Sequence, residues 1–205
     1  NLIPRFYDVT GGRVTIDGVD VREMDVHALR GMIGFAPQKG VLFSGTIASN
    51  IAYGAPDASE EQIREAAEIA QASEFIESKP TKFESPIAQG GSNVSGGQKQ
   101  RLSIARAIAR APRIYIFDDT FSALDFKTDA ALRRALGPKT QDSTVLIVAQ
   151  RISTILYADQ ILVLDDEGRL AGKGTHKELL ASCETYRQIA RSQLSEAELN
   201  QKEGA

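Results

Sequence analysis

The sequence predicts an α/β protein built on a parallel sheet covered by helices. Apolar side chains recur from Leu102 to Ala109 at the spacing of one helix face, and we expect this helix to start at about Gly97. Ile114–Phe117 is a continuous apolar run, as in a strand buried on both faces of a parallel sheet. Thr144–Ala149 is a second run of this kind. Together these patterns place the chain in the α/β class.

Shorter elements flank the sheet strands. Val14–Val21 alternates around Asp17-Gly18, a strong signal for a two-residue hairpin at an antiparallel edge. A short helix is expected from Val26 to Arg30, and a strand from Met32 to Ala36. The remaining expected elements are helices at Phe43–Tyr53, Ser59–Glu77 and Lys127–Leu136, the last closed by Gly137-Pro138, a hairpin of Gln160–Leu164 and Arg169–Ala171, and helices from Thr175 onward.

Composition limits the classes of protein that fit. The chain has 205 residues, of which 42% are hydrophobic, enough for one sizeable core. The net charge of −3 argues against a broad nucleic-acid surface, so no nucleic-acid partner is expected. The single cysteine, Cys183, excludes an internal disulfide and fits a reducing compartment. No apolar run approaches the ~18 residues that cross a bilayer.

The tripeptide Ser95-Gly96-Gly97 opens the predicted central helix. Ser95 is a good N-cap, and the two glycines leave the backbone bare at the positive end of the helix dipole. Such an end binds phosphate groups. Taken alone, the tripeptide is also explained as the cap of a surface helix, which is the more ordinary interpretation.

The apolar run at Ile114–Phe117 ends in Asp118 and Asp119. Ligands of open α/β sheets bind at the carboxyl ends of the strands, and a carboxylate there is suited to hold a magnesium ion on a nucleotide phosphate. The alternative is that both aspartates are solvated and cap the next helix.

These motifs, in this order, resemble the nucleotide-binding domain of ATP-binding cassette (ABC) transporters of the exporter type. Val94–Gln98 is similar to the signature loop of the family, Ile114–Asp118 to its Walker B strand and Ser122–Asp125 to its D-loop. The resemblance implies a P-loop NTPase (RecA-like) core with an antiparallel β edge and an inserted α-helical subdomain. It also implies ATP and Mg²⁺ as ligands.

The resemblance divides the chain into parts. Residues 1–37 and 113–174 correspond to the α/β core, 38–112 to the Q-loop and helical subdomain, and 175–205 to C-terminal helices. The phosphate-binding pattern Gly-x-x-x-x-Gly-Lys-Ser/Thr (Walker A) is absent from the sequence. The family has it just before a segment resembling Leu2–Tyr7. We therefore expect a fragment truncated at its N-terminus, inactive and aggregation-prone by itself.

Roles for single residues follow from the same resemblance. Asp118 and Gln38 correspond to the magnesium-binding residues, and Gln38 also to the glutamine that reaches the attacking water. The nucleotide-contacting residues are Ser95, Gly96, Gly97, Gln98 and Asp125. The catalytic positions hold Asp119 where the family has glutamate and Gln150 where it has histidine. An aspartate is one methylene shorter and a glutamine carries no imidazole charge, so this chain's own site is expected to hydrolyse ATP slowly if at all.

Cassettes of this family pair head to tail, so the signature loop of one chain closes over ATP held by the other. An intact loop beside a weak site resembles the degenerate half of a heterodimeric exporter. The expected partners are a second half-transporter and the transmembrane domain of the same full-length chain, at the cytoplasmic face of the cell membrane. The alternatives are a homodimeric exporter with two slow sites and a soluble regulatory ABC ATPase without transport.

Overall fold

The computed structural model describes residues 1–194 and divides the chain into two compact units, Asn1–Val148 and Ala149–Ala205. The domain boundaries predicted from the sequence stay predictions.

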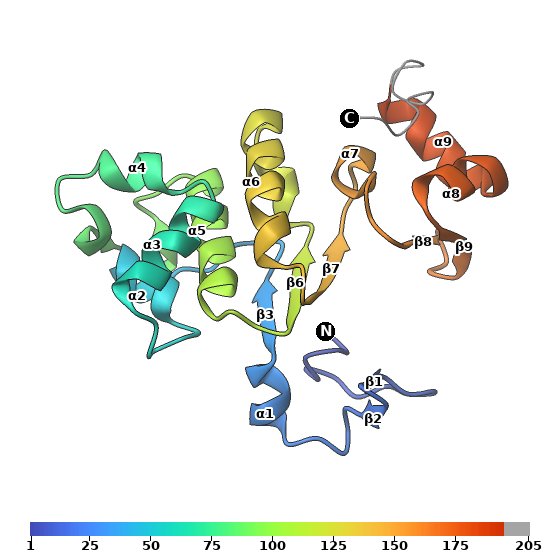
Figure 1. The fold of residues 1–205 in the computed structure, drawn as a ribbon, viewed down its shortest axis with the longest axis horizontal. Helices are drawn as coiled ribbons and strands as arrows, with labels where there is room; N and C mark the ends of the chain where they lie inside the picture. The colour runs from blue at the N-terminus through green and yellow to red at the C-terminus, as the bar shows by residue number, and fades with distance from the viewer. Residues whose placement is uncertain (195–205) are drawn as a thin grey trace. The chain divides into compact units, whose positions relative to one another are not determined.

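A three-stranded parallel sheet forms the centre of the first unit. Its strands are β3 (Ile33–Ala36), β6 (Ile114–Asp118) and β7 (Thr144–Val148), in the order β3-β6-β7. All three strands point toward the same end of the unit (Figure 1). The first four residues of β6 are buried, because this strand has a neighbour on each side. The predicted parallel sheet and its buried strand are therefore confirmed.

The strand β7 differs from the prediction that it would be buried. Its residues alternate between exposed and half-buried, and Val148 is 56% exposed. Within the described residues, β7 pairs with β6 alone and forms the edge of the sheet. Its apolar composition thus marks a strand, but the number of neighbouring strands decides its burial.

Helices pack on the sheet and enclose the main core. The longest are α5 (Gly96–Ala109) and α6 (Phe126–Lys139), each of 14 residues. The helices α2 (Ile47–Ala52), α3 (Glu60–Ile69) and α4 (Ser73–Glu77) gather beside α5 (Figure 1). Fully buried Leu102, Ile104 and Phe117 belong to one hydrophobic cluster, so the α5 helix and β6 share a core.

Two predicted helices at 43–53 and 59–77 are shorter than expected. The first begins only at Ile47, after the short strand β4 (Gly45–Thr46), which pairs with β5 (Pro86–Ile87). Thr46 forms a capping box with Ser49, which fixes the start of α2. The second pattern splits into α3 and α4, because Gln71 has a left-handed backbone (φ 57°) that ends the first helix. Ser59 forms a capping box with Gln62, which fixes the start of α3.

The helix α6 runs through the Gly137-Pro138 pair that was expected to close it. Proline has a φ compatible with a helix, but it lacks an N–H and its ring crowds the carbonyl four residues earlier. Pro138 is the second-last residue of α6, so this disturbance falls at the end of the helix. Thr140 then satisfies free carbonyls, since its Oγ1 donates to Leu136 O at 3.1 Å and to Gly137 O at 3.3 Å. The prediction that Gly137-Pro138 ends the helix was therefore wrong.

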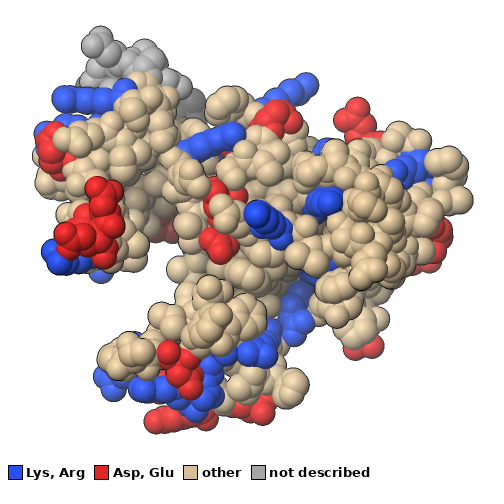
Figure 2. All heavy atoms as spheres, turned by 180° about the vertical axis from the view of Figure 1, so that it is seen from behind, with Lys and Arg blue, Asp and Glu red and all other residues tan. Residues whose placement is uncertain are grey.

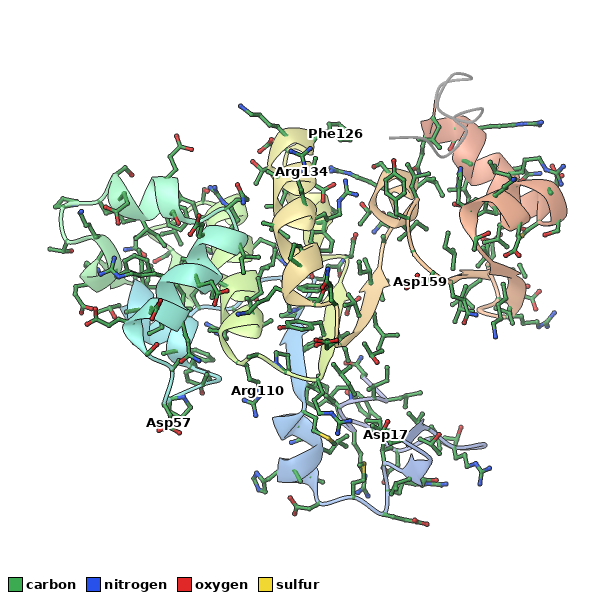
Figure 3. All side chains as sticks on the ribbon, in the orientation of Figure 1. Asp17, Asp57, Arg110, Phe126, Arg134 and Asp159 are labelled. Atoms are coloured by element: carbon green, nitrogen blue, oxygen red, sulfur yellow. The ribbon has the colours of Figure 1, made fainter. Side chains whose placement is uncertain are left out.

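Residues 1–31 precede the parallel sheet in the first unit. The predicted hairpin is present as β1 (Thr15–Ile16) and β2 (Val19–Asp20), and the predicted short helix as α1 (Val26–Gly31). Arg110, labelled in Figure 3, follows the last residue of α5 and donates from Nε to Gly31 O at 3.1 Å. Three 3₁₀ turns, Lys82–Glu84, Gln89–Gly91 and Thr120–Ala123, complete the elements of this unit.

The second unit has its own small core. It comprises α7 (Ile152–Ile155), the antiparallel strands β8 (Ile161–Leu164) and β9 (Leu170–Gly174), α8 (His176–Ser182) and α9 (Glu184–Gln193). The late hairpin and the C-terminal helices are confirmed as far as residue 194. His176 Nδ1 lies 2.7 Å from the hydroxyl of Tyr186. Burial raises the pKa of Tyr186 to about 12 and lowers the pKa of His176.

Two surface properties bear on function. On the face shown in Figure 2, both basic and acidic side chains occur between larger areas of uncharged residues. Across residues 1–194, each helix falls short of the length and apolar character that crossing a bilayer requires.

Candidate functional site

The loop Ser95-Gly96-Gly97 begins α5 as predicted. Gln98 N donates to Ser95 Oγ at 3.3 Å, and Ser95 N donates to Gln98 Oε1 at 3.0 Å, which makes a capping box. The box holds Ser95 in an extended conformation (φ −69°, ψ 164°), so the helix starts at Gly96. The backbone N–H groups of this first turn have no partner within the helix and form a positive end suited to an anion.

The two glycines of this loop have different surroundings. A Cβ placed on Gly96 would meet nothing within 4 Å, whereas one on Gly97 would lie 3.6 Å from the carbonyl oxygen of Ala123. Gly96 therefore faces open space, and Gly97 lies against the 3₁₀ turn Thr120–Ala123. Ser95 and Gly96 are both exposed to solvent.

Asp118 and Asp119 lie where the sequence predicts, at the carboxyl end of β6. Asp118 is half-buried and Asp119 is 8% exposed. Asp119 has a left-handed backbone (φ 45°, ψ 30°), a conformation that aspartate tolerates better than most residues. Its N–H donates to Val148 O at 2.9 Å, and Ser122 Oγ donates to its carbonyl at 2.8 Å. These bonds hold the backbone of Asp119 in place.

Gln38 and Asp119 are in direct contact. Nε2 of Gln38 donates to Oδ2 of Asp119 at 3.2 Å, although the residues are 81 positions apart. The parallel pairing of β3 with β6 explains this, because both strands end at the same edge of the sheet. The structure thus brings together Gln38, Asp118 and Asp119, three of the residues predicted from the sequence.

Asp125 is the N-cap of α6. Its carboxylate accepts hydrogen bonds from Thr128 N at 2.9 Å and from Thr128 Oγ1 at 2.7 Å. The bond from the Thr128 backbone is the largest cause that lowers the pKa of Asp125. Phe126, the first residue of α6, is 73% exposed and is labelled in Figure 3. This end of α6 therefore presents an ionised carboxylate and a large apolar side chain to solvent.

Gln150 belongs to the second unit. It is exposed, and its carbonyl accepts a hydrogen bond from Gln193 Nε2 at 2.8 Å. The other predicted site residues all belong to the first unit.

Two polar residues that support this site were missed in the sequence. Thr120 is fully buried and donates from Oγ1 to Ala36 O at 2.9 Å, which ties the ends of β3 and β6 together. Gln100 is 2% exposed and bonds to the loop that carries Gln38. A signal for Gln100 was present, because it precedes Ile104 by four residues and Ile108 by eight on a core-facing helix side.

The donor groups here suit a magnesium ion carried by a nucleotide. Mg²⁺ takes oxygen ligands, commonly one or two carboxylates together with phosphate oxygens. Asp118 offers a carboxylate and Gln38 an amide oxygen at the same sheet edge. Residues 1–194 contain no group of three or more His, Cys, Asp or Glu side chains placed to bind a metal.

Comparison with known proteins decides the family. The family model described as ABC transporter matches residues 1–122. The chain belongs to the ABC transporter family. It is 48% identical over 196 residues to an uncharacterized ABC transporter ATP-binding protein of Mycobacterium tuberculosis, covering 94% of this chain. It is 43% identical over 189 residues to a Staphylococcus aureus protein named for multidrug export, an ATP-binding/permease protein, covering 92% of this chain.

The fold of this ABC domain agrees with a solved relative. The structure of a bacterial Atm1-family ABC exporter with ATP bound matches 95% of the chain at 39% identity, with a TM-score of 0.91. The predicted P-loop NTPase class is thereby confirmed. The chain spans about a third of these relatives, 33% of the Mycobacterium protein and 34% of the exporter chain.

Proposed function

We propose that this chain is the ATP-binding cassette domain of a membrane exporter, which couples ATP binding and hydrolysis at a cassette dimer interface to substrate export. The observation that carries the proposal is the likeness, over 95% of the chain, to an exporter solved with ATP bound. The open N-terminus of α5 and the carboxylates at the end of β6 support it with chemistry suited to phosphate and magnesium.

In this proposal, each part of the site has its own task. Asp118 and Gln38 hold Mg²⁺ on the nucleotide phosphates at this chain's own site. The signature loop residues Ser95, Gly96, Gly97 and Gln98, with Asp125, contact the nucleotide held by the partner cassette. Gly96 is exposed and has no side chain, which favours this second task, because a bare backbone lets a phosphate come close.

The chain's own site is proposed to hydrolyse ATP slowly. Hydrolysis needs a carboxylate that orients the attacking water, and positioning dominates the rate of phosphoryl transfer. Asp119 is 8% exposed, its carboxylate reaches one methylene less far than glutamate, and it accepts the Gln38 amide at 3.2 Å. Gln150 supplies a hydrogen-bonding amide without the charge of an imidazole. Both features favour nucleotide binding over turnover.

A weak site beside an intact signature loop favours an asymmetric pair. We therefore propose that the partner is a different half-transporter with a competent site, which this chain completes. The full-length chain also supplies a transmembrane domain, and the cassette lies at the cytoplasmic face of the membrane. The relative named as an ATP-binding/permease protein supports the presence of a transmembrane domain.

The test is to purify the tagged full-length gene product from its native membrane, identify every stoichiometric partner by mass spectrometry and measure MgATP hydrolysis. We expect one second half-transporter, with glutamate and histidine at the positions of Asp119 and Gln150. Recovery of this chain as a homodimer refutes the asymmetric pair. Recovery without any membrane component refutes the exporter assignment, and absence of ATP hydrolysis refutes the ATPase assignment.

A further inference from the structure

Gln100 is a buried amide whose two ends are both bonded to one short loop. Its Nε2 donates to Pro37 O at 2.9 Å, and its Oε1 accepts from Gly40 N at 2.9 Å. Only this orientation of the amide satisfies both partners, because a carbonyl must accept and an N–H must donate. The two bonds enclose Gln38 and Lys39, so the amide of Gln100 holds the whole 37–40 loop against α5.

The loop fits this position closely. A Cβ on Gly40 would lie 2.9 Å from the carbonyl oxygen of Lys99 and 3.1 Å from Oε1 of Gln100. A side chain at position 40 would therefore push the loop away from the helix. Gln100 itself is 2% exposed, and an amide buried to this extent is costly without its partners. The bonded arrangement is thus strongly favoured over a loop that is partly released.

The contact connects two parts of the proposed mechanism. On one side, the held loop carries Gln38, which bonds to Asp119 at the end of β6. On the other side, Gln100 lies in the second turn of α5, whose first turn is the signature loop that begins at Ser95. A movement of Gln38 on nucleotide binding would therefore be transmitted through Gln100 to α5, the helix that presents the signature loop.

We propose that Gln100 is a positioning residue that couples the Gln38 loop to the signature loop. Because the signature loop serves the partner's site, nucleotide bound at this chain's slow site would set the activity of the other site through this amide. This inference rests on the proposed function and adds the residue by which the two sites communicate.

A double-mutant cycle on the full-length transporter, purified with its partner, tests the coupling. The variants are Gln38→Ala, Gln100→Met and the two combined, and the readout is the rate of MgATP hydrolysis. Gln100→Met should lower the rate about tenfold in the wild-type background, within the range of allosteric coupling. In the Gln38→Ala background it should lower the rate less than twofold, because the coupled loop is already altered.

Two further variants separate coupling from packing. Gly40→Ala displaces the same loop without changing α5 and should lower the rate as Gln100→Met does. If the Gln100→Met protein does not assemble, Gly40→Ala replaces it in the double-mutant cycle. Ser103→Ala is the matched control, since Ser103 is 1% exposed on the same helix and its hydroxyl has no hydrogen-bond partner within residues 1–194. It should keep the wild-type rate.

Two results would overturn the coupling: an equal loss from Gln100→Met in both backgrounds, or no loss in either. If the wild-type assembly itself does not hydrolyse MgATP, the proposed function fails and this inference fails with it. That outcome is distinguishable, because it is seen before any substitution is made.

Discussion

A negative charge at position 96 should stabilise the helix α5 and, at the same time, lower ATP hydrolysis at the partner's site. We consider Gly96→Asp in this chain, within the full-length assembly. A Cβ at this position meets nothing within 4 Å, and the residue is the first of α5, so the side chain fits without strain. The new carboxylate would lie at the positive end of the helix, where a phosphate of the partner's ATP is proposed to bind.

The two expected effects have opposite signs. An acidic side chain in the first turn of a helix stabilises the fold by about 0.3–1 kcal/mol, which raises the melting temperature by about 1–4 °C. Two like charges about 4 Å apart repel by about 4 kcal/mol at an effective dielectric constant near 20. At about 1.4 kcal/mol for each factor of ten, ATP hydrolysis at the partner's site should fall about 1,000-fold.

The assay measures MgATP hydrolysis and the melting temperature for wild type and three variants. Gly96→Ala adds the same Cβ without charge and should retain most of the activity. Gly137→Asp places the same charge near the end of α6, where a Cβ also meets nothing within 4 Å, and should keep the activity while losing some stability. Wild-type hydrolysis by Gly96→Asp would refute phosphate binding at this loop. Equal losses of ATP hydrolysis from Gly96→Ala and Gly96→Asp would show that the added volume, and not the charge, lowers the rate.

Three further predictions concern other residues. Asp119→Glu combined with Gln150→His should raise ATP turnover at this chain's own site by up to about 100-fold. The rate is measured in an assembly whose other site is inactivated by Gly96→Asp in this chain. No gain would contradict the proposal that this chain's own site is degenerate. Arg133→Met should destabilise the chain by about 3–5 kcal/mol in chemical denaturation, because it removes the guanidinium that binds Asp129, 1% exposed, at 2.9 and 3.3 Å. Replacing both Arg133 and Asp129 by leucine should lower the free energy of unfolding by less than Arg133→Met does. An equal loss of stability would contradict this explanation. Burial lowers the pKa of His176 below 6.5, so the unfolded state takes up a proton first as the pH falls. Stability should therefore be full above pH 6.5 and decrease below it, and the pH dependence of the melting temperature should be flatter for His176→Gln.

Local sequence determined several parts of this protein. The capping box at Ser95 and the start of α5 follow from residues three positions apart, so they could be predicted without knowing the fold. The apolar run of β6 likewise marks a strand from local sequence alone. The order of the motifs from Val94 to Asp125 was sufficient to predict the family, because it combines several short patterns at fixed spacing.

Tertiary structure decided what depends on neighbours distant in the chain. The burial of β7 depends on how many strands flank it, and its apolar sequence carries no information on that number. The break at Gln71 accompanies a hydrogen bond from Arg101 Nη1 to its carbonyl at 2.7 Å, a contact across 30 positions. Helix ends of this kind are set by contacts that local propensity does not contain.

The site itself divides in the same way. Its residue types were predictable one by one, but the hydrogen bond between Gln38 and Asp119 exists because β3 and β6 are parallel neighbours ending at one edge. The two hydrogen bonds between Gln100 and the Gln38 loop likewise form only because the helix α5 lies against that loop. The sequence by itself determined which groups are present and which helix and strand carry them. The packing of strands and helices decided which of those groups meet, because hydrogen bonds act only over about 3 Å.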